Sequence, residues 1–298
     1  MKRIAAWMAV MLMLFAGAAR AESTPLLYRV TDDAGHDLYL LGTVHVGWQE
    51  MYPLSEAVEN AWQAADVLAV EADVYEMTQN PVQVAQYALS LMYQDGDTAD
   101  RHLSPETYAL GVAHLGLTET MLRRMRPVAW ASLAEEACYT RLGCDGDNGI
   151  DHVLLKRAHE EGKPIDELEG MAFQIALMLA LPDAVCDDTI AAMLSDPEGM
   201  DAELARMLSA WARGDEAEFT AWIAQDINDY PPEKADVYQT YNAMLYDDRN
   251  AAFTLQAVDY LQSGQTALIA VGAAHVVGEG GIVDRLAKAG YSVQEIGR

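Results

Sequence analysis

Two copies of a Gly-x-x-His pattern are the residues of this chain best suited to chemistry. Gly42-Thr43-Val44-His45 lies near the N-terminus and Gly272-Ala273-Ala274-His275 near the C-terminus. Each follows a short apolar run typical of a buried β-strand, and its glycine lets the backbone turn tightly where that strand ends. An imidazole presented after such a turn can bind a divalent metal ion or transfer a proton near neutral pH.

Two glutamates follow two further predicted strands in the same way. The strand predicted over 66–71 ends at Glu71, and the strand predicted over 163–168 is followed by Glu169. The carboxyl ends of parallel strands in an open α/β sheet lie along one edge, where such folds place their binding sites. We therefore expect these two carboxylates to lie near His45 and His275.

Two histidines and one carboxylate leave coordination positions open for water, which is the arrangement of a hydrolytic metal centre. We predict His45, His275 and Glu71 as ligands of Zn, Mn, Co or Fe. Glu169 is then a hydrogen-bond acceptor behind the ligands, a second carboxylate ligand, or the base that takes a proton from the water. The alternative is that each histidine only caps or packs a strand end, because a lone Gly-x-x-His pattern arises readily by chance.

A third group of polar residues lies on predicted helices. Arg249-Asn250 falls in a helix predicted over 234–261. The pair either faces the core, with the arginine holding a carboxylate, or joins the site and stabilises a developing oxyanion. His152 adjoins Gly149-Ile150-Asp151 at a helix start, where Asp151 meets the helix dipole favourably. The remaining histidines are assigned to turns or solvated helix faces: His36, His102, His114 and His159.

Composition narrows the classes of function. The chain has 298 residues, of which 51% are hydrophobic, so it can bury a sizeable core. Its net charge of −27 disfavours binding to nucleic acid or anionic lipid.

The N-terminus has the pattern of a signal peptide, which consists of Lys2 and Arg3, an apolar run over 4–17 and the small residues around Ala21. We expect cleavage after Ala21 and a periplasmic or secreted product without stable membrane insertion.

The order of predicted elements indicates one α/β domain over 22–298 with a helical middle region at about 80–262. Three cysteines are present, and an oxidising compartment allows one disulfide of unassigned pairing with one thiol left over. We favour a structural role for them over a nucleophilic one.

The predicted strands cover 26–30, 37–41, 66–71, 163–168, 266–271 and 292–296. The main predicted helices cover 55–65, 127–141, 150–161, 172–181, 234–261 and 282–289, with further starts at Asn80-Pro81 and Ser104-Pro105. Residues 183–230 are predicted to be acidic and helical.

The motifs, in this order, resemble the TraB/PrgY/GumN family, and in particular its GumN-like bacterial branch. The resemblance covers nearly the whole chain after the signal peptide. It is carried by residues 40–47, Tyr52-Pro53-Leu54, 65–71, Gly149-Ile150-Asp151, 162–169, Arg249-Asn250, and 271–275 with Gly278 and Gly281.

The family is similar to the Tiki metalloproteases of animals, whose two Gly-x-x-His motifs and acidic residues form a divalent-metal site. The resemblance implies His45 and His275 as metal ligands with Glu71 as their acidic partner. Glu169, Arg249 and Asn250 match further family positions. It also implies an erythromycin-esterase-like or ChaN-like α/β fold, with a central mixed sheet of two related halves flanked by helices and a large helical insertion.

The predicted function is a divalent-metal-dependent hydrolase, most specifically a peptidase acting on short or unfolded segments. Glu71 or Glu169 would help to activate the water, and Arg249 or Asn250 would stabilise the oxyanion. Two alternatives remain open. One is a binding protein that captures a peptide, haem or an envelope component without turnover, and the other is a helper of polysaccharide export that needs a partner protein.

Overall fold

The computed structural model describes residues 23–228, 230 and 232–297, so the predicted signal peptide lies outside the described residues. These residues form a mixed β-sheet flanked by helices, which confirms the predicted α/β class. None of the described helices is long and apolar enough to cross a membrane.

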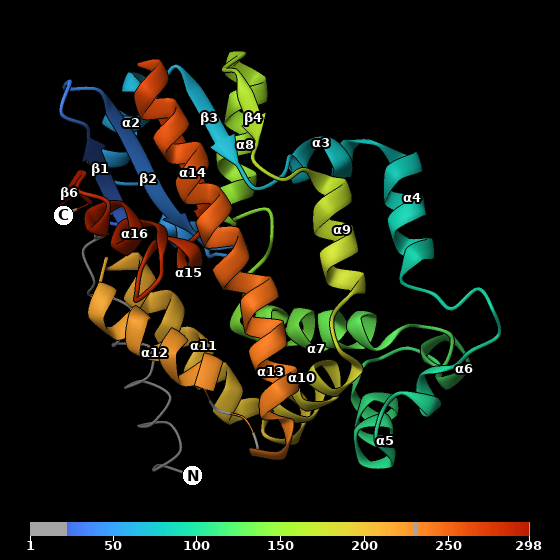
Figure 1. Cartoon of the computed structure of the whole chain (residues 1–298). Coiled ribbons are helices and arrows are strands. Elements are labelled where there is room, and N and C mark those ends of the chain that lie inside the picture. The colour runs from blue at the N-terminus through green and yellow to red at the C-terminus, as the bar shows by residue number, and fades with distance from the viewer. Residues whose placement is uncertain (1–22, 229, 231, 298) are drawn as a thin grey trace, which may run out of the picture.

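The sheet contains the strands β1 (Leu27–Thr31), β2 (Asp37–Thr43), β3 (Val67–Val70), β4 (Ile165–Glu167), β5 (Ala267–Gly272) and β6 (Ser292–Glu295). Their order in space is β4-β3-β5-β2-β1-β6. The first four are parallel to one another, β1 pairs antiparallel with β2, and the edge strand β6 pairs antiparallel with β1 (Figure 1). The carboxyl ends of β4, β3, β5 and β2 therefore lie along one edge, as predicted.

Helices cover the sheet and extend away from one end of it (Figure 1). In chain order they are α2 (Glu56–Ala64), α3 (Val74–Gln79), α4 (Pro81–Ser90), α5 (Pro105–His114), α6 (Glu119–Leu122), α7 (Pro127–Leu142), α8 (Ile150–Glu161), α9 (Met171–Leu179), α10 (Asp183–Ser195), α11 (Pro197–Ala212), α12 (Glu216–Asn228), α13 (Ala235–Asn242), α14 (Asp248–Ser263), α15 (Ala273–Val276) and α16 (Ile282–Lys288). Short 3₁₀ turns cover Gln49–Met51, Ala99–Arg101 and Pro232–Lys234.

The six predicted strands are all present, with ends shifted by at most two residues. Strong local signals explain this agreement. Asn80 and Ser104 cap α4 and α5 with their side chains, and Gly143 and Gly162 end α7 and α8 in the left-handed conformation.

Two helical predictions needed correction. The helix predicted over 234–261 is not uniform, because a π-helical segment, Ala243–Asp247, joins α13 to α14. That segment precedes Arg249, whose side chain donates to the Leu245 carbonyl (3.2 Å). The residues after Gly272, predicted as a turn, form the short helix α15.

The described residues contain two hydrophobic cores. The larger one fills the space around the sheet, and β5 is buried along its length because helices cover both of its faces. The smaller core lies in the helical middle region among α5, α6, α7 and α10, around Trp130, Leu122 and Ile190. The helical region therefore does not depend on the sheet alone for burial.

Trp211 of α11 connects the helical region to the sheet. Its indole is fully buried, and its Nε1 donates to the carbonyl oxygen of Gly42 (2.7 Å) at the end of β2. This contact holds α11 against the strand that leads to His45.

We expect Trp211→Phe to lower the free energy of unfolding by about 1–3 kcal/mol, because the buried Gly42 carbonyl loses its donor. Urea unfolding followed by circular dichroism measures the change. Trp222→Phe, at a partly exposed position of α12, is the control and should change stability less. Equal effects of the two substitutions would contradict the anchoring role of Trp211.

The disulfide that the sequence allowed does not form, because the three cysteines are free and buried in separate surroundings. Cys138 in α7 donates its S–H to Asp201 (2.9 Å). Cys144 lies in the sheet core and Cys186 in the smaller core. Burial raises the thiol pKa to about 12 for Cys138 and Cys186 and to about 11 for Cys144.

These thiols should be inert in the folded protein, since the thiolate is the reactive form and each group is shielded from solvent. We expect no thiol to react with Ellman's reagent under native conditions at pH 8, and all three to react after unfolding in guanidinium chloride. Rapid modification of the native protein would show that a cysteine is accessible and ionised.

Candidate active site

The two Gly-x-x-His motifs and Glu71 meet at Gly272, where β5 ends. A Cβ atom added to Gly272 would lie 3.4 Å from Oε1 of Glu71, 3.7 Å from Cδ2 of His275 and 3.9 Å from Nε2 of His45. Three side chains that are distant in sequence thus surround a small space that exists because residue 272 has no side chain. The residue types at this point are those that bind divalent metal ions.

His45 is held by a carboxylate from α8. Its Nδ1–H donates to Oδ2 of Asp151 (2.8 Å), and the other oxygen of that carboxylate accepts the Thr43 hydroxyl. This pairing leaves Nε2 of His45 turned toward the space beside Gly272. A carboxylate behind an imidazole is a common way to orient a metal-binding histidine.

Gly149-Ile150-Asp151 places this carboxylate. The Ile150 N–H donates to the Val44 carbonyl (2.9 Å), which joins the first turn of α8 to the segment after β2. A Cβ atom on Gly149 would lie 2.3 Å from the His45 carbonyl oxygen, so only glycine permits this close approach. The helix start therefore fixes Asp151 beside His45.

His275 is buried and is held by Asn250 of α14. The two residues interact through Nδ1 of His275 and Oδ1 of Asn250 (2.7 Å), while Nδ2 of Asn250 donates to the Gly280 carbonyl (3.0 Å). Because that amide nitrogen donates to Gly280, the oxygen is left to accept, and Nδ1 of His275 carries the proton. Nε2 then presents a lone pair toward Oε1 of Glu71, 4.0 Å away.

Arg249 joins the two glutamates predicted from the strand ends. Its guanidinium donates to Oε2 of Glu71 and to both oxygens of Glu169 (2.8 and 3.0 Å). Gln174 of α9 also donates to Glu71 (3.0 Å) and Glu169 (2.6 Å). Oε1 of Glu71 accepts the Gly272 N–H (2.8 Å) and faces the histidines.

Burial and charge set different protonation states in the cluster. Burial lowers the pKa of His275 to about 4, so its imidazole is neutral at neutral pH. Burial acts to raise the pKa of Glu71, but the positive groups around it, including Arg249, outweigh that effect and bring the pKa well below its usual range. The Asp151 carboxylate raises the pKa of His45 to about 9. His45 must therefore release a proton before it can bind a metal ion.

The donors of the cluster are close to, but not in, metal-binding geometry. Among the described residues, no group of three or more His, Cys, Asp or Glu side chains could hold an ion as the side chains stand. Two donors on one tetrahedral zinc ion, with bonds of about 2.0–2.2 Å, lie about 3.3–3.6 Å apart. The separation of 4.0 Å between His275 and Glu71 exceeds this by a few tenths of an ångström.

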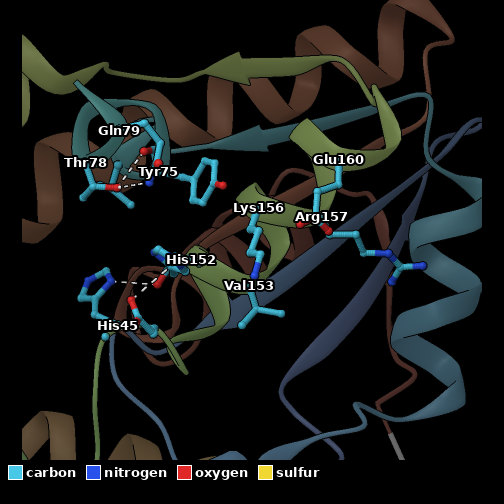
Figure 2. A pocket seen from close by; sticks show the side chains of 13 residues that line it. His45, Tyr75, Thr78, Gln79, His152, Val153, Lys156, Arg157 and Glu160 are labelled. Atoms are coloured by element: carbon cyan, nitrogen blue, oxygen red, sulfur yellow. Dashed lines mark hydrogen bonds and ion pairs between the residues drawn. The ribbon is translucent and has the colours of Figure 1, made fainter.

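Two pockets open beside His45. The larger one, of about 960 Å³, lies between α3 and α8 (Figure 2). His45 and Arg157 lie at opposite ends of it in that view, and His152 projects from α8 between them. The smaller pocket, of about 230 Å³, reaches Glu71 and Gln174. His45, Val74 and Asp151 line both pockets, so the cluster is accessible from two sides.

The six residues predicted for the site thus lie in one cluster: His45, His275, Glu71, Glu169, Arg249 and Asn250. Two further members escaped the sequence prediction of the site, namely Asp151 and Gln174. Asp151 stood in a glycine-containing motif but was assigned only to the helix dipole. Gln174 had no sequence signal, because its contacts with Glu71 and Glu169 depend on where α9 lies in the fold.

Comparison with known proteins agrees with this arrangement. The model of the TraB/PrgY/gumN family matches residues 26–295 of the chain. The chain belongs to this family. Its membership, which the sequence resemblance predicted, is confirmed. Two relatives are bacterial proteins called uncharacterized protein YbaP. The chain is 27% identical over 266 residues to that of Escherichia coli strain K12, covering 86% of this chain and 90% of the relative. It is 28% identical over 257 residues to that of Shigella flexneri, covering 83% and 87%. No solved structure matches this TraB/PrgY/gumN chain significantly.

We expect Asp151→Asn to lower the pKa of His45 from about 9 toward its ordinary value of 6.5, measured by NMR titration of the metal-free protein. A raised histidine pKa stabilises the fold fully below about pH 6.5, and this contribution disappears as the pH rises through about 9. The wild type should therefore exceed the variant in stability most at mildly acidic pH. The difference will be small, because 74% of the His45 side chain is exposed and solvent screens the pair. An unchanged pKa in the variant would contradict the pairing.

Proposed function

We propose that this protein is a divalent-metal-dependent hydrolase that cleaves peptides outside the cytoplasm. One observation carries the proposal. Two imidazoles, each with its Nδ1 in a hydrogen bond, and one ionised carboxylate converge on the space beside Gly272. Two histidines and a glutamate are a common ligand set of hydrolytic zinc enzymes.

In this proposal His45 and His275 would hold the ion through Nε2, and Glu71 would hold it through Oε1. When bound, a divalent ion supplies a Lewis acid and makes a water molecule a stronger acid. Asp151 and Asn250 keep the two imidazole rings in the orientation that directs Nε2 to the site. Because the ion would take Oε1 of Glu71 while Arg249 and Gln174 donate to Oε2, Glu71 would serve as a ligand in this proposal and not as the base.

Arg249, Glu169 and Gln174 act on Glu71 as positioning residues. Arg249 is 5% exposed and contacts both carboxylates, so it compensates the negative charge that they bury. Both oxygens of Glu169 accept hydrogen bonds from Arg249, so this carboxylate is not free to act as a base. The oxyanion role predicted for Arg249 or Asn250 stays a prediction, since their donors contact the glutamates and the Gly280 carbonyl.

Two features support the choice of substrate and compartment. The open pocket of about 960 Å³ beside His45 has room for an extended chain, and the family resembles the Tiki metalloproteases. The N-terminal signal-peptide pattern supports export to the periplasm or the exterior.

The test combines metal analysis with a cleavage assay on a fluorescence-quenched peptide library. We expect the purified protein to bind about one divalent ion per chain, and His45→Ala or His275→Ala to lose the ion and at least about 100-fold in cleavage rate. His36→Ala, which replaces a partly exposed histidine of a surface turn, is the matched control and should behave as wild type.

Variants of Asp151 and Asn250, which hold the two histidines, should have a smaller effect on metal binding than loss of a histidine. Asp151→Asn and Asn250→Ala should each weaken metal binding by about 10–100-fold, because they loosen an imidazole without removing it. Cleavage that survives in His45→Ala would contradict the proposal. Tight binding of a peptide or haem without any product would instead indicate a protein that captures its ligand.

A further inference from the structure

The smaller pocket beside Glu71 has an apolar wall whose residues have no role in the hydrolysis proposed above. Its wall includes Val74 and Met77 of α3, Tyr87 of α4, and Met171, Ile175 and Met178 of α9. We call this space the methionine pocket. We propose that the methionine pocket binds one large apolar side chain of the substrate, next to the bond that is cut. This inference rests on the proposed function.

The position of the methionine pocket ties it to the reacting groups. His45, Glu71 and Asp151 form its polar end, and His45 and Asp151 also line the larger pocket. A peptide lying in the larger pocket therefore passes His45, where one of its side chains can enter the methionine pocket. The residue that enters must be close to the bond brought to His45 and Glu71.

The wall of the methionine pocket suits an apolar group. Its polar end has few unpaired atoms, because Gln174 donates to Glu71 and Glu169, and Asp151 accepts from His45 and Thr43. The Tyr87 hydroxyl donates to the Met178 sulfur (3.6 Å), and burial raises the pKa of Tyr87, so it stays neutral. An entering hydrocarbon group would displace water from apolar surface without stripping partners from polar groups.

The volume limits what can enter. The pocket measures about 230 Å³, below the roughly 300–1,000 Å³ of pockets that enclose a whole small-molecule ligand. It can hold several water molecules, each of about 30 Å³, or one large side chain. A single side chain of a longer substrate fits this size better than a separate ligand.

The identity of the wall predicts which side chains are preferred. Met77, Met171 and Met178 are unbranched and adapt to irregular apolar shapes, so leucine, methionine and phenylalanine should all be accepted. The apolar wall offers a carboxylate no partner to replace its water, so aspartate and glutamate should be rejected. Alanine would leave most of the pocket unfilled.

The first experiment measures cleavage by the metal-loaded protein of blocked peptides that differ only in one central residue. We expect kcat/KM for the leucine peptide to exceed that for the alanine peptide by about 10–100-fold. Met77→Trp should fill the pocket and abolish this preference while cleavage of the alanine peptide persists. Met121→Trp, at a methionine that is 52% exposed in α6, is the control and should keep the preference.

Ile175→Phe is a second filling variant, for use if Met77→Trp fails to fold by circular dichroism. Both folded filling variants retaining the full preference for leucine would overturn the proposal. So would a wild type that cleaves both peptides equally well.

The second experiment does not depend on catalysis. In the metal-free protein labelled with ¹³C-methyl methionine, the leucine peptide should shift the methyl signals of Met77, Met171 and Met178, whereas the alanine peptide should not. The Met121 signal should not respond to either peptide. If no peptide is cleaved but these shifts appear, the proposed function fails and the methionine pocket stands. If the leucine peptide is cleaved but no methyl signal shifts at saturating peptide, the assignment of the pocket is overturned.

Discussion

The missing side chain of Gly272 is the constraint on which the site depends. Parallel pairing places the end of β5 between the ends of β3 and β2, so anything attached to residue 272 would project among their functional groups. A single methyl group there would stand within 4 Å of Glu71, His45 and His275. Strand register brings these three residues together, and the absence of a Cβ leaves the space in which their polar atoms face one another.

Charge is the second requirement, because Glu71 and Glu169 are both largely buried. Two carboxylates in a poorly solvated position would repel each other unless a cation compensated them. Arg249 supplies that cation from α14, immediately before Asn250, which holds His275. The first turn of α14 thus contacts both the Glu71 carboxylate, through Arg249, and the His275 imidazole, through Asn250. The π-helical segment Ala243–Asp247 directly precedes this turn.

The sheet and the helical middle region have different parts in this arrangement. Strand ends supply His45, His275, Glu71 and Glu169, which determine what chemistry is possible. The helices α3, α8 and α9 supply most of the walls of both pockets, which determine what can reach that chemistry. Of these helices, α3 and α8 pack into the core around the sheet, whereas Met178 and Leu179 at the end of α9 pack against the smaller core.

The sequence alone determined the elements and the positions of the main functional residues, because these depend on local signals. Apolar runs ended by Gly42 and Gly272 specify both the strands and the histidines that follow. Tertiary structure decided the contacts that have no local signal. Asp151 meets His45 across 106 positions and Gln174 meets Glu71 across 103, and such pairings depend on how α8 and α9 pack. The cysteines stayed free for the same reason, since Cys144 is buried in the core around the sheet and Cys186 in the smaller core.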